Sequence, residues 1–216
     1  MSAPRPPSFN RIARPYRWLE YLTLGTALQN CRTHFLPELL HSHRALVLGD
    51  GDGRFLAQLL LSSPRLQATA IDSSSAMLAL LRRRCAQAST RLTTIHTDAL
   101  THPLAGRYDL IVTHFFLDCL TQAELESLTL RVVPHLQPGA LWLLSDFRIP
   151  PTGALRLPSH LFVRLLYLAF RLLTGLRTTQ LPNHTEALTH AGLTRLAHHQ
   201  SLQGLLISEL WQAPVA

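Results

Sequence analysis

The stretch Arg44–Leu56, RALVLGDGDGRFL, decides the fold. Four apolar residues lead into three glycines at alternate positions, Gly49, Gly51 and Gly53, and the apolar run FLAQLL follows. This order is typical of a buried strand, a tight loop and a helix. Glycines let the chain reverse sharply, let a ligand approach the backbone and let the helix pack closely on the strand. Unpaired N–H groups at the helix start are suited to a polar or charged ligand.

The glycine spacing distinguishes two cofactor classes. A dinucleotide fingerprint, G-x-G-x-x-G, needs a further glycine where this chain has Arg54 or Leu56. The pattern G-x-G-x-G after a strand resembles motif I of the class I S-adenosylmethionine (SAM) methyltransferases. That motif has an acid where this chain has Val47, and we expect Asp50 to replace it near the SAM ammonium. For Asp52, loop solvation and helix N-capping are as good an explanation as a cofactor contact.

Strand and helix patterns alternate regularly after the glycine loop. Strands are expected at 66–71, 91–96, 108–114 and 140–147, with helices over 73–88 and 121–136 and a turn at 138–139. This rhythm predicts a parallel sheet with helices on both faces, which binds ligands at the carboxyl ends of its strands. Thr121 and Glu124 form a predicted capping box, and Ser73 or Ser74 is expected to cap the preceding helix.

The end of the chain departs from this alternation. A long apolar and basic helix is expected within 154–176 and a short helix within 181–192, followed by strands at 193–200 and 204–212. Class I methyltransferases close their sheet with such an antiparallel pair, in the order 3-2-1-4-5-7-6, so the resemblance covers nearly the whole chain. We predict an α/β, Rossmann-like fold with a doubly wound seven-stranded sheet, mostly parallel with an antiparallel C-terminal hairpin.

The resemblance implies one methyltransferase domain over 9–216, after a proline-rich segment 1–8 that we expect to be disordered. The expected parts are an N-terminal helical lid at 9–43, a SAM-binding core at 44–147, acceptor-side helices at 148–192 and closing strands at 193–216. In this family N-terminal helices close over the cofactor, which makes Tyr16 a candidate lid residue. Packing of this aromatic side chain against the core is an equal alternative.

Residues after the second and third strands complete the expected SAM site. Asp72 can accept hydrogen bonds from both ribose hydroxyls, a contact that NAD-binding folds also use. Ser73 follows, and Met77 is placed where a hydrophobic residue flanks the adenine or simply fills the core. The resemblance implies that Asp98 binds the exocyclic amine of adenine and that the N–H of Ala99 binds a ring nitrogen. A turn or capping role is the alternative for Asp98.

The fourth strand ends in THFFLDC, where Thr113 and His114 should face the sulfonium and the methyl group. Enzymes that methylate DNA adenine or amide nitrogens carry Asn/Asp-Pro-Pro-Tyr/Phe here, which argues against those substrates. His114 is the candidate general base, because the pKa of a free histidine lies near neutrality. A structural histidine, or one that contacts SAM through its backbone, is the alternative. Asp118 is a weaker candidate for which helix capping is preferred.

Composition limits the chemistry and the partners. The formal net charge is +7, and all 20 basic residues are arginine, which excludes Schiff-base chemistry and a lysine base. The arginines are scattered along the sequence, so a nucleic acid partner is not favoured. No metal-binding pattern occurs among the 12 histidines. Three cysteines without a zinc spacing and no evident signal peptide predict free thiols and a cytoplasmic location.

Residues 156–173, RLPSHLFVRLLYLAFRLL, form the second informative stretch. Arg164 and Arg171 share a helical face, and most of the other residues are apolar. The alternatives are a membrane-surface helix, a lid over a lipophilic acceptor, a dimer contact, or a mostly buried helix with two snorkelling arginines. The sequence leaves all four open.

The segments FNRIARPY, IDSSSAML and SDF are loosely similar to those of ubiquinone/menaquinone-biosynthesis methyltransferases. We therefore predict SAM-dependent methyl transfer to a small, lipophilic acceptor, with S-adenosylhomocysteine as the product. A non-catalytic SAM-fold binding protein is one alternative, which the departure at Val47 leaves open. An NAD(P)-dependent oxidoreductase is the other, and the missing third glycine and the absence of lysine disfavour it.

Overall fold

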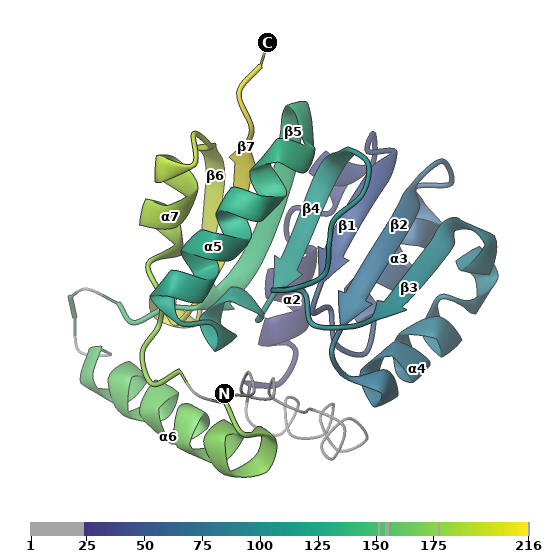
Figure 1. Cartoon of the computed structure of the whole chain (residues 1–216). Coiled ribbons are helices and arrows are strands. Elements are labelled where there is room, and N and C mark those ends of the chain that lie inside the picture. Colours follow the sequence, from purple (N-terminus) through teal and green to yellow (C-terminus); the bar gives the residue numbers. More distant parts are fainter. Residues whose placement is uncertain (1–23, 151, 154–155, 177, 216) are drawn as a thin grey trace, which may run out of the picture.

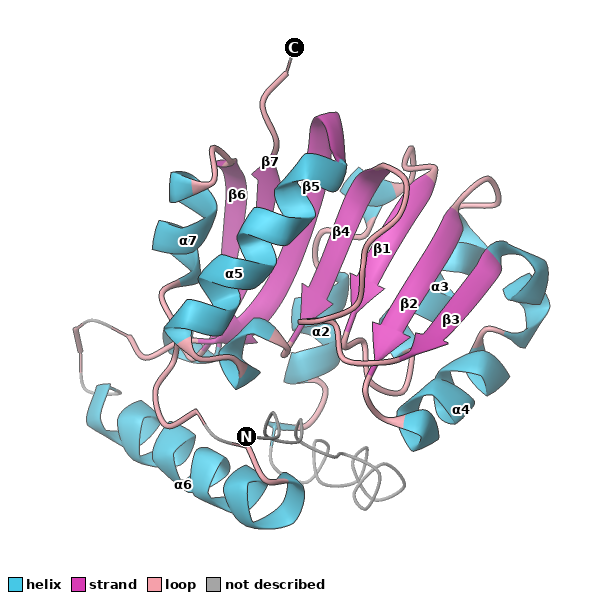
Figure 2. Ribbon diagram, in the orientation of Figure 1, coloured by secondary structure: helices cyan, strands magenta, loops and turns pink. Residues whose placement is uncertain are grey.

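A computed structural model describes residues 24–150, 152–153, 156–176 and 178–215. Seven strands form one sheet in the order β3-β2-β1-β4-β5-β7-β6 (Figures 1 and 2). The strands β1 to β5 are parallel, and β7 runs antiparallel to both of its neighbours. The predicted fold class and strand order are confirmed.

The described elements have the following bounds. The strands are β1 Arg44–Leu48, β2 Gln67–Asp72, β3 Leu92–His96, β4 Tyr108–His114, β5 Leu136–Phe147, β6 Thr194–Ser201 and β7 Leu206–Gln212. The α-helices are α2 Ala27–Thr33, α3 Arg54–Ser62, α4 Ser75–Arg84, α5 Gln122–Val132, α6 Arg156–Thr174 and α7 His184–His190. Short 3-10 turns are η1 Pro37–Leu39, η2 Ala86–Arg91, η3 Leu117–Cys119, η4 Val133–His135 and η5 Leu202–Gly204.

Helices cover both faces of the sheet (Figure 2). On one face, Ala45 and Val47 of β1 pack in a cluster with α3 and α4. On the other face, Leu46 and Leu48 pack in a cluster with α5 and α7. Because β1 is buried on both sides, its sequence is a continuous apolar run rather than an alternating one. The helix α6 lies apart from both layers, at the edge where the parallel strands end (Figure 1).

Prolines explain two differences from the predicted boundaries. The helix expected over 121–136 ends at Val132, because Pro134 cannot continue the α-helical ladder, and the 3-10 turn η4 follows. The turn expected at 138–139 is wrong: β5 already begins at Leu136 and includes both residues. Its register with β4 shifts between Tyr108 and Leu110, so the irregular backbone at this point is a bulge inside the strand.

The other boundary differences are small, apart from the end of α4. Asp72 is the last residue of β2, one position beyond the expected strand. The helix α4 ends at Arg84 instead of residue 88, and η2 covers the remainder. Of the expected lid over 9–43, residues 24–43 contain α2 and η1, whereas 9–23 lie outside the described residues.

The predicted capping box at the start of α5 is confirmed. Thr121 Oγ1 accepts a hydrogen bond from the Glu124 N–H at 3.3 Å, and Glu124 Oε2 accepts one from the Thr121 N–H at 2.8 Å. These bonds satisfy two backbone donors that the first turn of the helix leaves unpaired.

We expect Thr121→Ala to lower the free energy of unfolding by about 1 kcal/mol, because α5 loses its side-chain cap. Urea denaturation followed by circular dichroism measures the change. The control is Thr189→Ala, since Thr189 is exposed and lies within α7 rather than at a helix start. Equal stability of the two variants would show that the cap does not stabilise the fold.

Candidate functional site

The predicted site residues lie at four neighbouring strand ends. The glycine loop follows β1, Asp72 ends β2, Asp98 follows β3, and His114 ends β4. Because these strands are adjacent in the order β3-β2-β1-β4, residues far apart in the sequence meet along one edge of the sheet (Figure 1). This is the edge at which open parallel sheets bind ligands.

The loop glycines meet different steric conditions. Gly51 has a φ of +63°, and a Cβ added to it would have no heavy atom within 4 Å. Gly53 has a φ of +77°, and a Cβ there would lie 2.8 Å from the Cα of Leu81. A Cβ added to Gly49 would overlap the Phe116 ring. The backbone is therefore closed by packing at Gly49 and Gly53 and open at Gly51, where a ligand can approach it.

Asp50 turns back onto the start of α3. Its Oδ2 accepts a hydrogen bond from the Leu56 N–H at 3.2 Å, while its Oδ1 is buried without a hydrogen-bond partner. Burial raises the pKa of Asp50 to about 7, and the charge of Arg32 and the bond from Leu56 oppose the rise. A buried carboxyl oxygen without a donor favours a ligand that brings a cation or an N–H group.

Asp52 has a structural role that is neither of the two expected for it, loop solvation or helix N-capping. It is buried rather than solvated, and the N-cap position of α3 is Gly53, which has no side-chain cap. Its carboxylate binds Arg54 Nε at 2.9 Å and an Arg84 guanidinium nitrogen at 2.8 Å. Since Arg84 belongs to α4, this ion pair fastens the glycine loop to the next helix.

Asp72 holds the start of α4 and keeps one oxygen for another partner. Its Oδ1 accepts a hydrogen bond from the Ser74 N–H at 2.7 Å. Burial raises the pKa of Asp72 to about 6, opposed by the Ser74 N–H and by His96. Ser74, rather than Ser73, is the N-cap of α4, and its hydroxyl accepts a bond from the Met77 N–H. Met77 is buried, which fits both roles that the sequence left open for it.

Asp98 shapes the turn after β3. Its Oδ1 accepts a hydrogen bond from the Leu100 N–H at 2.9 Å, and its backbone carbonyl accepts bonds from Thr101 and His102. Ala99 is buried, and no described residue accepts a hydrogen bond from its N–H in this turn. The carboxylate and this N–H therefore lie on consecutive residues, as recognition of an adenine edge requires.

Thr113 and His114 point to opposite faces of the sheet. Thr113 is fully buried, and its hydroxyl accepts a hydrogen bond from Trp142 Nε1 at 3.0 Å, so its side chain serves the core. The His114 ring is buried edge-on against Phe55, with centroids 4.4 Å apart. Neither of its nitrogens has a hydrogen-bond partner among the described residues.

The expected near-neutral pKa of His114 is wrong for the folded chain. Burial, and secondly the charge of Arg32, lower the pKa of His114 well below its ordinary value. The imidazole is therefore neutral at physiological pH, and it is a weaker proton acceptor than a free histidine.

Arg32 is a site residue that the sequence reasoning missed. It belongs to α2 and is 6% exposed, and its guanidinium lies over the Phe115 ring, 4.9 Å from the centroid. The charge of Arg32 lowers the pKa of both Asp50 and His114, which indicates that the guanidinium lies near both side chains. The sequence signal for its burial is its position four residues after Leu28 and three residues before Phe35, on the apolar side of a helix. Tyr16, the predicted lid residue, lies outside the described residues.

Two further buried carboxyl groups occur where β4 and β5 end. Asp118 lies in η3 and does not cap α5, so the preferred capping role is wrong, because Thr121 occupies that position. Burial raises the pKa of Asp118 to about 6. Burial and the neighbouring Asp118 raise the pKa of Asp146 well above its ordinary value, opposed by the backbone N–H groups of Asp118 and Phe116. Burial thus favours the protonated form of Asp146 beside the turn after β4.

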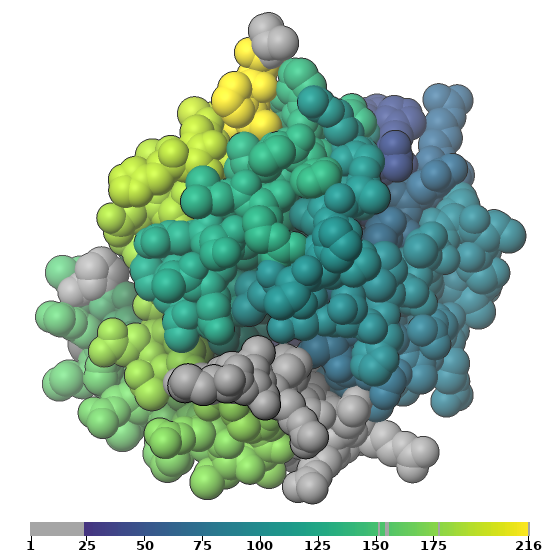
Figure 3. All heavy atoms as spheres, viewed as in Figure 1, coloured from purple at the N-terminus to yellow at the C-terminus, as the bar shows by residue number. Residues whose placement is uncertain are grey.

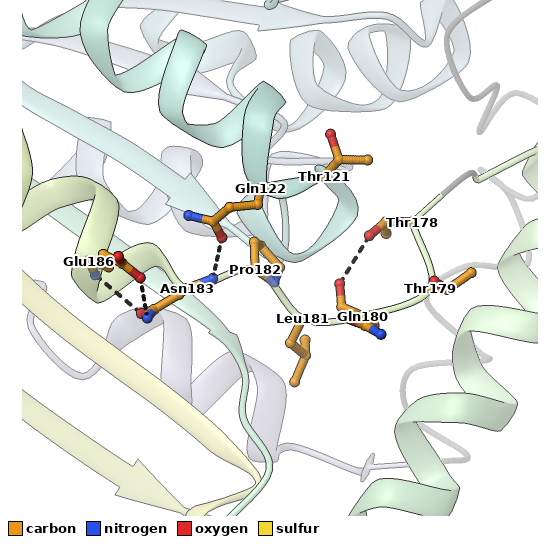
Figure 4. Close-up of a pocket in the computed structure, with 9 residues that line it drawn as sticks. All are labelled: Thr121, Gln122, Thr178, Thr179, Gln180, Leu181, Pro182, Asn183 and Glu186. Carbon is orange, nitrogen blue, oxygen red and sulfur yellow. Dashed lines mark hydrogen bonds between the residues drawn. The ribbon is translucent and has the colours of Figure 1, made fainter.

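A cavity of about 450 Å³ lies on the same edge, between the start of α5 and the segment that leads into α7 (Figure 4). Gln122 Oε1 accepts a hydrogen bond from the Asn183 N–H at 2.7 Å, and Asn183 caps α7 through Glu186. None of the predicted cofactor residues lines this cavity. It is therefore separate from the predicted cofactor site.

Comparison with known proteins decides between the cofactors. Residues 45–139 match the family described as Methyltransferase domain, which covers the glycine loop, Asp72, Asp98 and His114. Within residues 45–139, the chain matches a class I SAM-dependent methyltransferase domain. SAM is the cofactor that this match indicates, and similar solved methyltransferases bind SAM or S-adenosylhomocysteine, so the oxidoreductase alternative is set aside. The open approach at Gly51 and the unpaired oxygen of Asp50 fit this group, because SAM offers an ammonium and a polar chain to the loop.

Solved structures share the fold at low sequence identity. One is the N-methyltransferase NodS from Bradyrhizobium japonicum with S-adenosylhomocysteine: identity 18%, TM-score 0.62, 87% of this chain and 88% of that one. Another is an O-methyltransferase family 2 protein from Planctomyces limnophilus with apigenin. Its identity is 19% and its TM-score 0.67, and the match covers 91% of this chain and 61% of that one. A third is human N-acetylserotonin methyltransferase with SAM. Its identity is 14% and its TM-score 0.66, and the match covers 95% of this chain and 55% of that one. No curated protein sequence matches the chain.

We expect Asp72→Ala to weaken the binding of S-adenosylhomocysteine by about 1–3 kcal/mol, because a buried carboxylate no longer accepts the ribose hydroxyls. Isothermal titration calorimetry measures the affinity. Asp72→Asn is the matched variant, because its amide oxygen still accepts the Ser74 N–H and preserves the start of α4. Unchanged affinity in both variants would remove Asp72 from the ribose site.

The raised pKa of Asp50 predicts pH-dependent cofactor binding. Below about pH 7 the carboxyl is protonated, so a cationic amino group must displace that proton in order to pair with it. The affinity for S-adenosylhomocysteine should therefore rise as the pH increases from about 6 to about 7.5, where an α-amino group is still charged. Calorimetry across this interval should give a flatter dependence for Asp50→Asn. The same slope in both proteins would contradict the assignment.

Proposed function

We propose that this methyltransferase domain transfers the methyl group of SAM to a small, lipophilic acceptor that binds between the strand ends and α6. The observation that carries the proposal is an aromatic cluster at this place. The Phe115 and Phe147 rings lie 5.3 Å apart, and Phe147 and Phe162 lie 6.2 Å apart. Val163 and Tyr167 of α6 belong to the same apolar cluster. Aromatic walls of this kind suit an apolar or aromatic ligand.

Backbone strain next to His114 supports a functional role for this position. Phe115 has a φ of +51°, a left-handed conformation that a bulky side chain adopts at an energetic cost. Its N–H donates to the Ser145 carbonyl of β5 at 2.6 Å, which holds the residue in place. The strained backbone directs the Phe115 ring toward Phe147 and under the Arg32 guanidinium. It thereby forms a boundary between the cofactor side and the acceptor side.

The residues of this chain have positioning roles in the proposed reaction. SAM supplies an activated methyl group, and the transfer needs in-line alignment of the acceptor atom more than covalent help. The neutral His114 ring can accept a hydrogen bond from an acceptor hydroxyl or amine. The aromatic cluster holds the apolar body of the acceptor and excludes water from the same edge.

We further propose a cytoplasmic location. In support of it, Cys31, Cys85 and Cys119 are free thiols in the structure, and Cys31 and Cys85 are buried. A reducing compartment keeps cysteines in this state. The similar Planctomyces protein binds apigenin, a small molecule, which supports a small-molecule acceptor here.

Calorimetry and a transfer assay test this function. The purified chain is titrated with SAM, S-adenosylhomocysteine and NADH, and then incubated with SAM labelled in the methyl group and a panel of phenols, quinols and hydrophobic amines. We expect binding of the first two ligands only, and label transfer to a member of the panel. Failure to bind SAM and S-adenosylhomocysteine would favour the non-catalytic SAM-fold alternative. Binding with transfer only to polar acceptors would overturn the lipophilic class.

We expect His114→Ala to lower turnover and to leave the affinity for S-adenosylhomocysteine nearly unchanged, because the role proposed for the ring is a hydrogen bond with the acceptor. Loss of one positioned hydrogen-bonding group corresponds to roughly a 10²-fold decrease in kcat. His114→Asn is a matched variant that retains a hydrogen-bonding side chain. Full turnover in His114→Ala would assign the histidine a structural role only.

A further inference from the structure

The helix α6 exposes a leucine stripe along its whole length. Leucines that are between 48% and 80% exposed recur at helical spacing on its outer side: Leu157, Leu161, Leu165, Leu168, Leu172 and Leu173. Its buried residues lie on the opposite side: Ser159, Val163, Tyr167 and Thr174. The alternative of a mostly buried helix is therefore wrong. Figure 3 shows α6, in light green, at the lower surface of the molecule.

Positive charge borders this stripe. Arg164 and Arg171 are exposed and lie three or four positions from leucines of the stripe, so they are their neighbours on the helix surface. Arg156 and His160 are exposed at the first turns. None of the 19 residues of α6 is acidic. The outer side of the helix thus combines apolar side chains with unopposed guanidinium groups.

The helix is suited to lie on a membrane rather than to cross one. Among the described residues, α6 is the one helix that is long and apolar enough to span a bilayer, by length and composition only. Arg164 lies near its middle, where a charge at the bilayer centre is unfavourable. Its inner side is also fixed to the domain, since Tyr167 donates a hydrogen bond to the Asp118 carbonyl at 2.7 Å.

We propose that α6 docks the domain onto an anionic phospholipid surface. The leucine stripe enters the boundary of the acyl chains, and Arg164 and Arg171 pair with headgroup phosphates. The cluster proposed to hold the acceptor contacts the inner side of the same helix. A lipophilic acceptor would therefore reach the site from the bilayer, a consequence that rests on the proposed function, whereas the docking itself does not.

Charge favours a lipid surface over the two protein alternatives. In a symmetric dimer through α6, arginines of one copy would face arginines of the other, with no acid on either helix to pair with them. Residues 1–23 also carry four arginines and a single acid, Glu20, so that segment has the same sign of charge. Anionic headgroups are the complementary partner.

Vesicle co-sedimentation of the full chain tests the docking. The probes are phosphatidylcholine vesicles and vesicles of equal parts phosphatidylcholine and phosphatidylglycerol, each at low and high salt. We expect binding to the anionic vesicles that weakens with salt, and weaker binding to the neutral ones. No binding to anionic vesicles would overturn the proposal. So would dimerisation in sedimentation velocity that Leu165→Glu/Leu168→Glu abolishes while vesicle binding stays unchanged.

Matched variants identify the surface responsible. Leu165→Glu/Leu168→Glu should lower the vesicle partition coefficient about tenfold or more, and Arg164→Gln/Arg171→Gln should lower it similarly and reduce its salt dependence. The controls are Leu61→Glu/Leu130→Glu and Arg65→Gln/Arg83→Gln, which change exposed residues elsewhere. Equal losses in the controls would overturn the role of α6.

Titration with S-adenosylhomocysteine separates docking from cofactor binding. All variants should bind it like the unmodified chain, because α6 contributes none of the predicted cofactor residues. Vesicle binding without cofactor binding would contradict the proposed function and leave the docking intact. Cofactor binding without vesicle binding would contradict the docking and leave the proposed function intact.

Discussion

Gly53 brings α3 and α4 closer together than any side chain would permit. The Leu81 backbone occupies the space of its missing Cβ, and the left-handed conformation at Gly53 turns the chain from β1 into α3. The ion pairs of Asp52 with Arg54 and Arg84 secure the same junction. Because α3 begins at this point, its N-terminal end and the Asp50 carboxyl are presented at the end of β1. The position of the cofactor site follows from this one packing constraint.

Burial of carboxyl groups is the second organising feature. Asp50, Asp72, Asp118 and Asp146 all have raised pKa values, and burial is the largest cause for each of them. Backbone N–H groups compensate part of this cost, as Ser74 does for Asp72. A fold tolerates such groups where a ligand or a tightly bent turn needs them. The two pairs differ in location, since the first borders the glycine loop and the second lies beside the turn after β4.

The sequence was sufficient for the fold, because central strands such as β1 and β4 are short apolar runs that end next to a glycine or at a polar residue. It also indicated which strand ends carry polar groups, although their contacts with SAM remain predictions. It did not reveal Arg32 or Asp146, since both lie in segments whose pattern only signals a helix or a strand. The pKa of His114 was equally hidden, because it depends on Phe55 and on Arg32 in a different helix. Long-range packing determines these properties, and local pattern does not encode it.

The separation of α6 from the two helical layers has an evolutionary consequence. Its inner side packs in a cluster distinct from the two that stabilise the sheet, and the leucines of its outer side are exposed. Substitutions on the outer side of α6 can change which surface or ligand the domain binds without disturbing the strands or the glycine loop. A lineage could exchange acceptors or surfaces through this helix while selection preserves the remainder. Divergence is then concentrated in one segment, and the scaffold remains evolvable at little risk to folding.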